Sequence, residues 1–232
     1  MKKRIVVLTG AGISAESGIS TFRAADGLWE NHDIMAVASY DGWLKNRELV
    51  LNFYNDRRRQ LFDVVPNAAH LALVELEKNY DVTIVTQNVD DLHERAGSSK
   101  IIHLHGELRK VRSTVDAKLV YDWVGDVKIG HKCDKNSQLR PHIVWFGEDV
   151  PLIFTAMDAV ASAHIVIVVG SSMQVYPAAG LVGHATASAP IFYIDPRPAL
   201  NHELELRKNL TVIAENATVG VRTLVDQLNN GF

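Results

Sequence analysis

The stretch GAGISAESGISTFRAADGLW, residues 10–29, decides how the rest of this sequence is interpreted. It follows the apolar run RIVVLT, residues 4–9, which predicts a buried first strand. Gly10 and Gly12 stand where this strand turns, and backbone N–H groups at such a turn can bind a pyrophosphate, because a side chain there would hold the ligand away. The spacing of Gly10, Gly12 and Gly18 is not the GxGxxG of ordinary dehydrogenases, and a tight turn without a ligand gives the same pattern. The rest of the chain has to distinguish the two.

The composition indicates one α/β core. The chain has 232 residues with 47% hydrophobic content, which is enough for one sizeable core and a small satellite module. Its 24 basic and 27 acidic residues give a net charge of -3, so we expect binding to neither nucleic acid nor membranes. Apolar runs are short, and Lys2 and Lys3 lead directly into the first strand, which predicts a cytoplasmic protein without a signal peptide. The single cysteine, Cys133, excludes an intramolecular disulfide and a multi-cysteine metal site.

Apolar runs alternate with helical patterns along the chain. Near-continuous apolar runs are typical of parallel strands that are covered on both faces. One helix is predicted after Pro66 and a last one over residues 220–229, each with one apolar face. This alternation predicts an α/β fold with a doubly wound parallel sheet. The further runs that predict strands are 82–86, 101–104, 142–146, 164–169 and 191–194.

Two segments fit this sheet poorly. Residues 30–65 form a helix-rich insertion, and residues 107–140 are polar and irregular. We interpret the two segments together as a smaller module that packs on the main domain. The main, Rossmann-like domain would then consist of residues 1–29, 66–106 and 141–232.

Polar residues follow four of the predicted strands. A parallel sheet binds ligands beyond the carboxyl ends of its strands, so these positions are the ones to inspect. Ordinary caps and turns also favour Asn, Asp, Ser and Gly. Four strand ends that converge on one edge nevertheless indicate a ligand site. The residues concerned are 87–90, 103–106, 170–172 and Asp195.

Five motifs, taken jointly, resemble the sirtuin family of NAD-dependent protein lysine deacylases. They are GAGISAESGISTFR (10–23), TQNVDDLHERAG (86–97), HLHGEL (103–108), LRPHIVWFGE (139–148) and VVGSSMQVYPAA (168–179). The resemblance spans about residues 4–228 and is strongest to the bacterial class with a Tyr-x-x-Arg acyl pocket, which removes acetyl and succinyl groups. It implies NAD as cofactor, acylated protein lysines as partners, and nicotinamide and 2′-O-acyl-ADP-ribose as products. Separately from the resemblance, we expect a monomer.

The resemblance implies the roles of several residues. His105 matches the catalytic histidine that accepts a proton from a ribose hydroxyl, and a neutral imidazole near pH 7 suits such a base. His103 is expected to be structural. Asn88 and Asp90 match the pair that holds nicotinamide during bond cleavage. The other expected cofactor-binding residues are Gly10, Ala11, Gly12, Ser14, Phe22, Arg23, Trp29, Gln87, Val89, Gly170, Ser171, Ser172, Asp195, Pro196, Arg197 and Ala217.

The substrate side rests on two further motifs. Tyr54 and Arg57 lie three residues apart on a predicted helix and would share a face, where a phenol and a guanidinium can grip one carboxylate. A solvated face is the commoner meaning of the run 57–59, so the acyl pocket depends on the match to Tyr-x-x-Arg. The family's peptide-binding segment, which pairs with an extended substrate, matches residues 144–148. The expected substrate-binding residues are Ala38, Tyr54, Arg57, Val144, Phe146, Gly147 and Glu148.

One departure from the family concerns zinc. Most sirtuins hold a structural zinc with two pairs of cysteines. The corresponding positions here are Ser113, Asp116, Cys133 and Asn136. One thiolate with weak oxygen partners does not make a tight tetrahedral site, so we expect no structural zinc.

Two other functions remain open at this point. One is an NAD glycohydrolase or ADP-ribosyltransferase that uses the same cleft with another acceptor. The other is a non-catalytic sensor of NAD or ADP-ribose. The intact Asn88, Asp90 and His105 argue against the sensor, and the peptide-pairing segment around Phe146 argues against the glycohydrolase.

Overall fold

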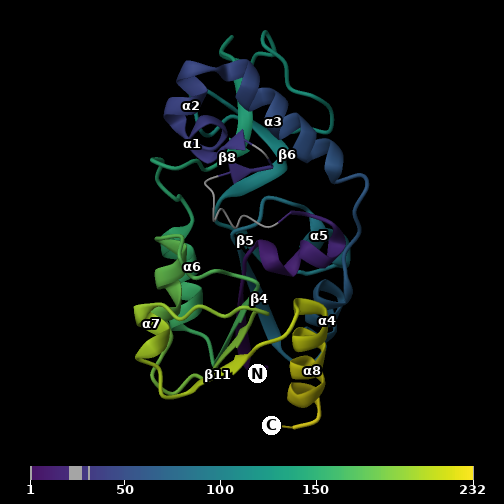
Figure 1. The fold of residues 1–232 in the computed structure, drawn as a ribbon, viewed down its shortest axis with the longest axis vertical. Coiled ribbons are helices and arrows are strands. Elements are labelled where there is room, and N and C mark those ends of the chain that lie inside the picture. The colour runs from purple at the N-terminus through teal and green to yellow at the C-terminus, as the bar shows by residue number, and fades with distance from the viewer. Residues whose placement is uncertain (1, 21–27, 31, 232) are drawn as a thin grey trace.

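The computed structural model describes residues 2–20, 28–30 and 32–231 and shows a mixed α/β fold (Figure 1). The strands of its main sheet are β1 (Arg4–Thr9), β4 (Asp81–Thr86), β5 (Ile101–His103), β9 (Ile165–Val169), β10 (Ile191–Ile194) and β11 (Leu210–Ile213). They lie in the order β11-β10-β9-β1-β4-β5, and every neighbouring pair is parallel. The doubly wound parallel sheet predicted from the sequence is therefore confirmed.

The direction in which this sheet grows reverses at β1. Strands β4 and β5 lie on one side of β1, and β9, β10 and β11 lie on the other. Thr9, the last residue of β1, is in register with Thr86 on β4 and with Val169 on β9. Loops diverge at such a reversal and leave a crevice outside the carboxyl ends of the strands. The fold therefore directs a ligand to the space beyond Thr9 and Val169.

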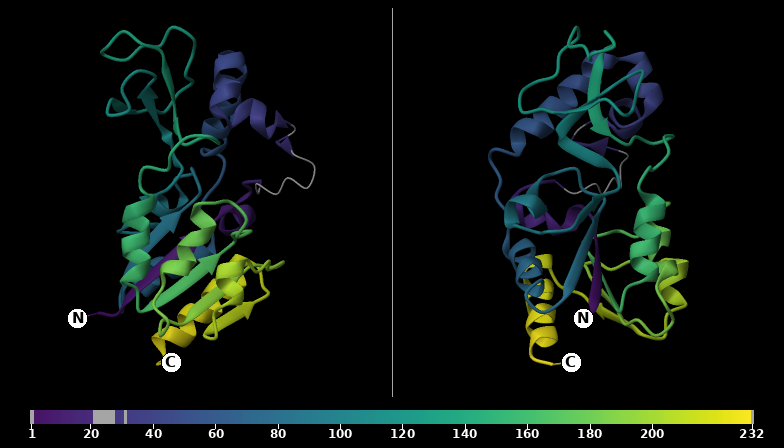
Figure 2. Two further views of the ribbon diagram at one scale, coloured as in Figure 1. Left: turned by 90° about the vertical axis from the view of Figure 1, so that its left-hand side faces the viewer. Right: turned by 180° about the vertical axis from the view of Figure 1, so that it is seen from behind.

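Helices cover both faces of the main sheet, as Figures 1 and 2 show. One face carries α4 (Ala68–Leu76) and α8 (Ala217–Asn229), and the other carries α6 (Ile153–Ala161), η3 (Ala178–His184) and α7 (His202–Glu205). Successive side chains of β1 enter the two cores alternately, with Ile5 and Val7 on one side and Val6 and Leu8 on the other. Burial on both faces explains why these strands are apolar throughout.

Helix α8 starts earlier than its sequence indicates. The apolar periodicity predicts a start at residue 220, whereas the helix begins at Ala217. Glu16 explains the difference, because its carboxylate accepts hydrogen bonds from the backbone amide of Thr218 at 3.0 Å and from its hydroxyl at 2.7 Å. Glu16 belongs to the short η2 turn (Ala15–Ser17), which follows η1 (Ala11–Ile13). An acidic group from a distant part of the chain thus satisfies the amino end of the last helix.

A second, antiparallel sheet stands apart from the main sheet (Figure 2). It consists of β6 (Gly106–Ser113), β7 (Val120–Asp122) and β8 (Leu139–Ile143), in the order β7-β6-β8. The prediction that residues 107–140 are irregular was wrong, since β7 and all but the first residue of β6 lie within that segment. The predicted strand 142–146 was also misplaced. Its first residues end β8, and the rest lines the cavity described below.

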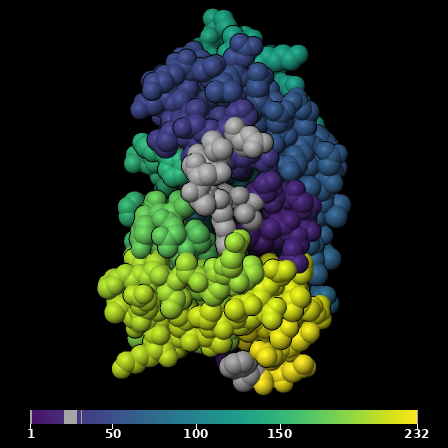
Figure 3. All heavy atoms as spheres, viewed as in Figure 1, coloured from purple at the N-terminus to yellow at the C-terminus, as the bar shows by residue number. Residues whose placement is uncertain are grey.

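Short helices complete this part of the molecule. The two-residue strands β2 (Leu28–Trp29) and β3 (His32–Asp33) lead into α1 (Ile34–Val37), α2 (Tyr40–Lys45) and α3 (Arg47–Gln60), and short α5 (Leu92–Ala96) follows β4. Helices α2 and α3 share an apolar core with the small sheet that includes Trp43, Phe53 and Trp145. In the space-filling view, α1 and α2 lie toward one end of the molecule and α7 and α8 toward the other (Figure 3).

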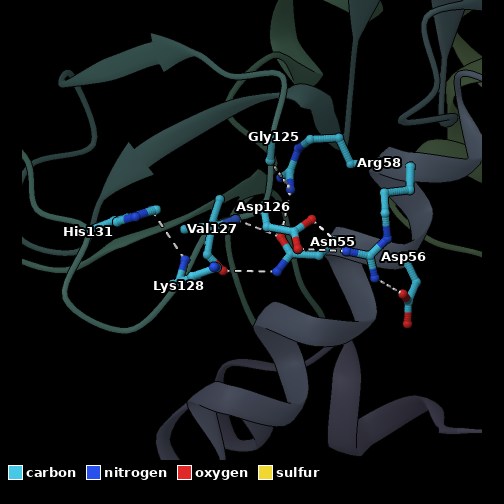
Figure 4. A network of polar contacts seen from close by, with 9 residues as sticks. Asn55, Asp56, Arg58, Gly125, Asp126, Val127, Lys128 and His131 are labelled. Atoms are coloured by element: carbon cyan, nitrogen blue, oxygen red, sulfur yellow. Dashed lines mark hydrogen bonds and ion pairs between the residues drawn. The ribbon is translucent and has the colours of Figure 1, made fainter.

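Buried polar contacts fasten α3 to the segment that follows β7 (Figure 4). The side chain of Asn55 donates to the Val127 carbonyl at 2.9 Å and accepts the Val127 amide at 2.8 Å. Arg58 is 1% exposed, and its Nε donates to the Leu108 carbonyl at 2.7 Å. Arg59, the next residue, is exposed. The run of arginines therefore does not form one solvated face.

Candidate active site

A cavity of about 260 Å³ lies beyond the carboxyl ends of β1, β4 and β9 and extends to the small sheet and α3. Most of the predicted site residues line it, although they come from segments far apart in the sequence. These residues are Gly10, Ala11, Gly12, Trp29, Ala38, Tyr54, Arg57, Gln87, Asn88, Val89, Asp90, His105, Val144, Phe146, Gly147, Glu148, Gly170, Ser171 and Ser172. Three of the four strand ends that were expected to converge therefore meet at this cavity, and the one with Asp195 does not.

The remaining predicted cofactor residues lie outside this lining. Within the described part of the chain they are Ser14, Asp195, Pro196, Arg197 and Ala217. The carboxylate of Asp195 is buried at the end of β10 and accepts the amide of Arg197 at 2.8 Å. Ala217 is buried in the apolar core under α8. Two more predicted residues, Phe22 and Arg23, lie outside the described residues.

The glycines of the first loop are required for a reason that the sequence did not indicate. The amides of Gly10 and Gly12 donate to the carbonyls of Val169 and Gly170 at 3.0 and 2.8 Å, so these N–H groups join two loops of the protein. A Cβ atom at Gly10 would lie 2.7 Å from the Gly170 oxygen, and one at Gly12 would lie 2.5 Å from the Gly170 Cα. Two bare backbones therefore pack against each other and form a floor without side chains.

A buried hydrogen-bonded group stands at the end of β4. The hydroxyl of Ser14 donates to Oδ2 of Asp90 at 3.0 Å, and Nδ2 of Asn88 donates to the same hydroxyl at 3.1 Å. The amide of Leu92 donates to Oδ1 of Asp90 at 3.1 Å. Burial nevertheless raises the pKa of Asp90 to about 6, because desolvation outweighs these hydrogen bonds. The positions of the Asn88 amide and the Asp90 carboxyl are thereby fixed.

His105 is oriented by one backbone group. Its Nδ1 lies 3.1 Å from the Gln87 carbonyl oxygen, and a carbonyl can only accept, so Nδ1 carries the proton. Burial lowers the pKa of His105 despite this hydrogen bond, and the ring is therefore neutral at pH 7. Its Nε2 is left as an acceptor, which is the state a general base needs. His103 instead pairs with Glu94, in line with the structural role expected for it.

The other end of the cavity is formed by α3 and the segment after β8. The hydroxyl of Tyr54 accepts a hydrogen bond from Nε1 of Trp145 at 3.0 Å, and Tyr54 is fully buried. Nη1 of Arg57 lies 2.8 Å from Oε1 of Glu30. Tyr54 and Arg57 thus face the same cavity, as their spacing predicted, but each has a partner within the protein.

Residues 10–177 match the Sir2 family. The chain belongs to the Sir2 family. A relative from Helicobacter pylori named NAD-dependent protein deacylase is 59% identical over 226 residues, which cover 97% of this chain and 97% of the relative. One of the same name from Bacteroides thetaiotaomicron is 50% identical over 228 residues, with 96% of each chain covered. The sirtuin resemblance inferred from the motifs is therefore confirmed.

Solved Sir2 structures share the fold of this Sir2 member. A Sir2 homologue in complex with NAD has a TM-score of 0.87 at 39% identity, covering 99% of this chain and 90% of that one. A Sir2 protein bound to an acetylated peptide has a TM-score of 0.81 at 29% identity, covering 98% and 94%. The mixed α/β architecture with a small module is thus the Sir2 fold.

The zinc positions of this Sir2 member hold a hydrogen-bonded cluster. The Cys133 thiol donates to the Ser113 hydroxyl at 3.2 Å, and the same hydroxyl accepts the Asp116 amide at 3.2 Å. The Asn136 amide donates to the Cys133 carbonyl at 2.8 Å, and the Asp116 carboxylate pairs with Lys135 at 2.8 Å. One thiol, a hydroxyl, a carboxylate and an amide do not fit a structural zinc site, which takes cysteine and histidine ligands.

The structure also assigns Glu148 a different environment from the one expected. Its carboxylate accepts two hydrogen bonds from Arg140, at 2.6 and 2.9 Å, two longer ones from Arg112, and one from the Trp145 amide at 2.9 Å. The Arg140 guanidinium lies 3.4 Å from the Trp145 ring centroid. With its carboxylate committed to these groups, Glu148 shapes the segment before it.

Sequence reasoning missed three charged residues in the Sir2 site and its support. Glu30 contacts Arg57, Arg140 holds Glu148, and buried Arg58 supports α3. The pairing of Arg140 with Glu148 had a signal, since both stand in one quoted motif with opposite charges. Glu30 and Arg58 had none, because their partners are distant in the sequence or depend on the rotation of α3.

Proposed function

We propose that this Sir2-family chain is an NAD-dependent protein-lysine deacylase that releases nicotinamide, free lysine and 2′-O-acyl-ADP-ribose. The observation that carries the proposal is the His105 imidazole, which is neutral and whose Nε2 has no partner among the described residues, within a cavity formed by strand ends on one side and α3 on the other. The relatives named NAD-dependent protein deacylase support the same activity.

The residues at the strand ends fit NAD. The floor formed by residues 10–12 and 170–172 lacks bulky side chains, which lets a dinucleotide approach the backbone closely. Asn88 and Asp90 provide a fixed amide and a fixed carboxyl next to this floor, as recognition of a carboxamide requires. When bound, NAD supplies the ribose that receives the acyl group as nicotinamide leaves.

The chain's own residues then orient groups and move a proton. Nε2 of His105 accepts a proton from a ribose hydroxyl, and the Gln87 carbonyl holds the ring in position and stabilises the positive charge that forms on it. The Ser14 hydroxyl holds the Asn88 and Asp90 side chains in fixed positions, so these groups need no rearrangement before the reaction. We assign the adenosine side to residues 170–172 and to Asp195, Pro196, Arg197 and Ala217 beyond them.

The substrate enters beside the segment 144–147. The Val144 amide donates to the His105 carbonyl at 2.9 Å and the Phe146 amide to the Ala38 carbonyl at 2.9 Å, so this segment connects the two sides of the cavity. Because the amides of residues 144–146 already donate within the protein, an extended acylated peptide would pair with the other main-chain groups of this segment, a mode that tolerates many side chains around the lysine. A broad set of lysine contexts follows from this mode of binding.

The acyl group extends toward α3. Ala38 leaves room there, and Tyr54 with Arg57 offers a phenol and a guanidinium to a short dicarboxylic acyl group. We therefore expect the chain to remove both acetyl and succinyl groups. We retain the division into an NAD-binding domain (1–29, 66–106 and 141–232) and a small module, and expect a cytoplasmic monomer. None of the described helices is long and apolar enough to cross a membrane.

One experiment tests the function directly. The protein is incubated with NAD and matched acetyl-lysine and succinyl-lysine peptides, and deacylated peptide and nicotinamide are followed by mass spectrometry. With each peptide, we expect one nicotinamide to be released for every peptide that is deacylated. Nicotinamide without deacylated peptide would instead indicate a glycohydrolase or ADP-ribosyltransferase, and the absence of both products would indicate a sensor.

A further inference from the structure

The acyl end of the cavity contains a carboxylate that the mechanism above does not use. Glu30 connects β2 and β3 and lines the same cavity as Tyr54 and Arg57. Its Oε1 lies 2.8 Å from Nη1 of Arg57, and the two side chains are 25% and 17% exposed. At this distance and exposure, water and salt screen the two charges weakly.

This contact leaves the Arg57 guanidinium with unused donors. Its Nη1 meets the Glu30 carboxylate, but its buried Nε has no acceptor among the described residues, so Glu30 engages the guanidinium on one side only. A buried N–H group without an acceptor is unfavourable, and a guanidinium binds a carboxylate best through two parallel hydrogen bonds. A carboxylate that enters the cavity in line with these donors would therefore be a better partner than Glu30.

The backbone conformation at Glu30 does not favour a glutamate. Its φ is 51°, in the left-handed region that glycine, asparagine and aspartate adopt most readily in short hairpin connections. A hydrogen bond from Ser20, and the charge and a hydrogen bond of Arg57, lower the pKa of the Glu30 carboxyl, so the group is ionised at neutral pH. Departures from local preference are typical of functional positions, and here the side chain's contact with Arg57 is the feature to explain.

We propose that Glu30 competes with the substrate for Arg57 and thereby sets the acyl preference. With a neutral acyl group such as acetyl, Glu30 remains on Arg57 and balances its charge. A dicarboxylic acyl group such as succinyl or malonyl has to displace Glu30, and the displaced carboxylate stays nearby as a like charge. Glu30 therefore favours neutral acyl groups. This inference rests on the proposed acyl pocket.

The test compares kcat/KM for matched succinyl and acetyl peptides in the wild type and in Glu30→Gln. We expect the succinyl-to-acetyl ratio to rise about tenfold, since one neighbouring like charge changes a carboxylate equilibrium by about one pKa unit or more. The rise should come mainly from KM for the succinyl peptide. It should vanish when Glu30→Gln is combined with Arg57→Met, because the competition needs the guanidinium.

Asp56→Asn is the matched control. It removes the same charge from the exposed residue next to Arg57 on α3, and we expect the ratio to stay within about twofold. An unchanged ratio in Glu30→Gln, together with a selective loss of desuccinylation in Arg57→Met, would overturn the role of Glu30 but keep the acyl pocket. Equal losses on both peptides in Arg57→Met would remove the pocket and this inference with it. Thermal unfolding of each variant checks that it is folded.

Discussion

The two ends of the cavity differ in how fully their polar groups are satisfied. At the nucleotide end, hydrogen bonds through the Ser14 hydroxyl link Asn88 and Asp90. Asp90 and His105 are each also hydrogen-bonded to a backbone group. At the acyl end, Nη1 of Arg57 meets only the Glu30 carboxylate, and its buried Nε has no acceptor among the described residues. Catalysis needs groups whose positions are fixed before the substrate arrives, whereas a binding pocket gains selectivity from donors that only the right ligand completes. One cavity thus combines an end whose side chains are already fixed by hydrogen bonds with an end where a buried donor of the described residues still lacks a partner.

The two ends also rest on different parts of the fold. The nucleotide end is built from the ends of central parallel strands, whose hydrogen bonds run to neighbours on both sides. The acyl end depends on α3, which the small sheet and the segment after β7 hold in place through Asn55 and Arg58. The predictions below separate these two kinds of support.

The largest effect is expected at His105. Replacing it by alanine removes the only general base assigned to the reaction, and deacylation of both peptides should fall by about 10³-fold or more in kcat/KM. The matched control is His103→Ala, which removes a nearby imidazole that pairs with Glu94 and should cost far less. Similar losses in the two variants would show that neither ring acts as the base.

Arg58 should matter for stability and not directly for chemistry. Arg58→Met removes the Arg58 donor from the buried Leu108 carbonyl and one of two hydrogen bonds to the Asn55 oxygen, and we expect a loss of about 3 kcal/mol in the free energy of unfolding. Urea unfolding measures it. Arg59→Met removes an exposed arginine from the same helix and should cost less than about 1 kcal/mol. Equal costs would mean that burial of Arg58 contributes nothing.

Arg57→Met tests the acyl end of the cavity. Loss of a guanidinium that binds a carboxylate should lower kcat/KM for the succinyl peptide by about 100-fold and change that for the acetyl peptide by less than about threefold. Steady-state kinetics on matched peptides measure both. Arg59→Met again serves as control, and a succinyl loss of the same size there would indicate a general effect of positive charge on α3.

The pH dependence of stability tests the nucleotide end. The pKa of Asp90 is raised from 3.8 in the unfolded chain to about 6 in the folded protein. The folded state therefore binds the proton more tightly, and Asp90 stabilises the fold at low pH and ceases to do so as the pH rises through 6. Relative to Asp90→Asn, the wild type should lose about 2 kcal/mol of stability between pH 4 and pH 7. Urea unfolding at both pH values measures this difference, and a constant difference would contradict the raised pKa.

The smallest effect concerns zinc. The Ser113 and Cys133 cluster needs no metal to satisfy its hydrogen bonds, so a chelator should leave the unfolding temperature unchanged. Elemental analysis of purified protein should find well below one zinc per chain. A stoichiometric, tightly bound zinc would overturn this expectation.

The main sheet could be predicted because its strands are buried on both faces and therefore apolar throughout. The small sheet was missed for the opposite reason. Strand β6 buries residues 106 and 108 and then 111 and 113, because a register shift between Glu107 and Val111 breaks the two-residue period that marks a strand. Strand β11 was also missed, because this four-residue edge strand is partly exposed.

The site residues at the nucleotide end could be predicted from position alone, since they follow strands whose carboxyl ends must meet at one edge. The partners at the acyl end could not. Glu30 and Arg57 are far apart in the sequence and come from a hairpin and a helix, so no spacing rule relates them.

By itself, the sequence determined the doubly wound class of the sheet, the edge at which ligands bind and the family to which the chain belongs, because apolar runs, turn residues and contiguous motifs are local properties. Only the tertiary structure decided that Glu30 pairs with Arg57, that Arg58 is buried against Leu108, and that the first glycines serve loop packing. Charge pairing and close backbone contact depend on distances between segments, and the order of residues along the chain does not contain those distances.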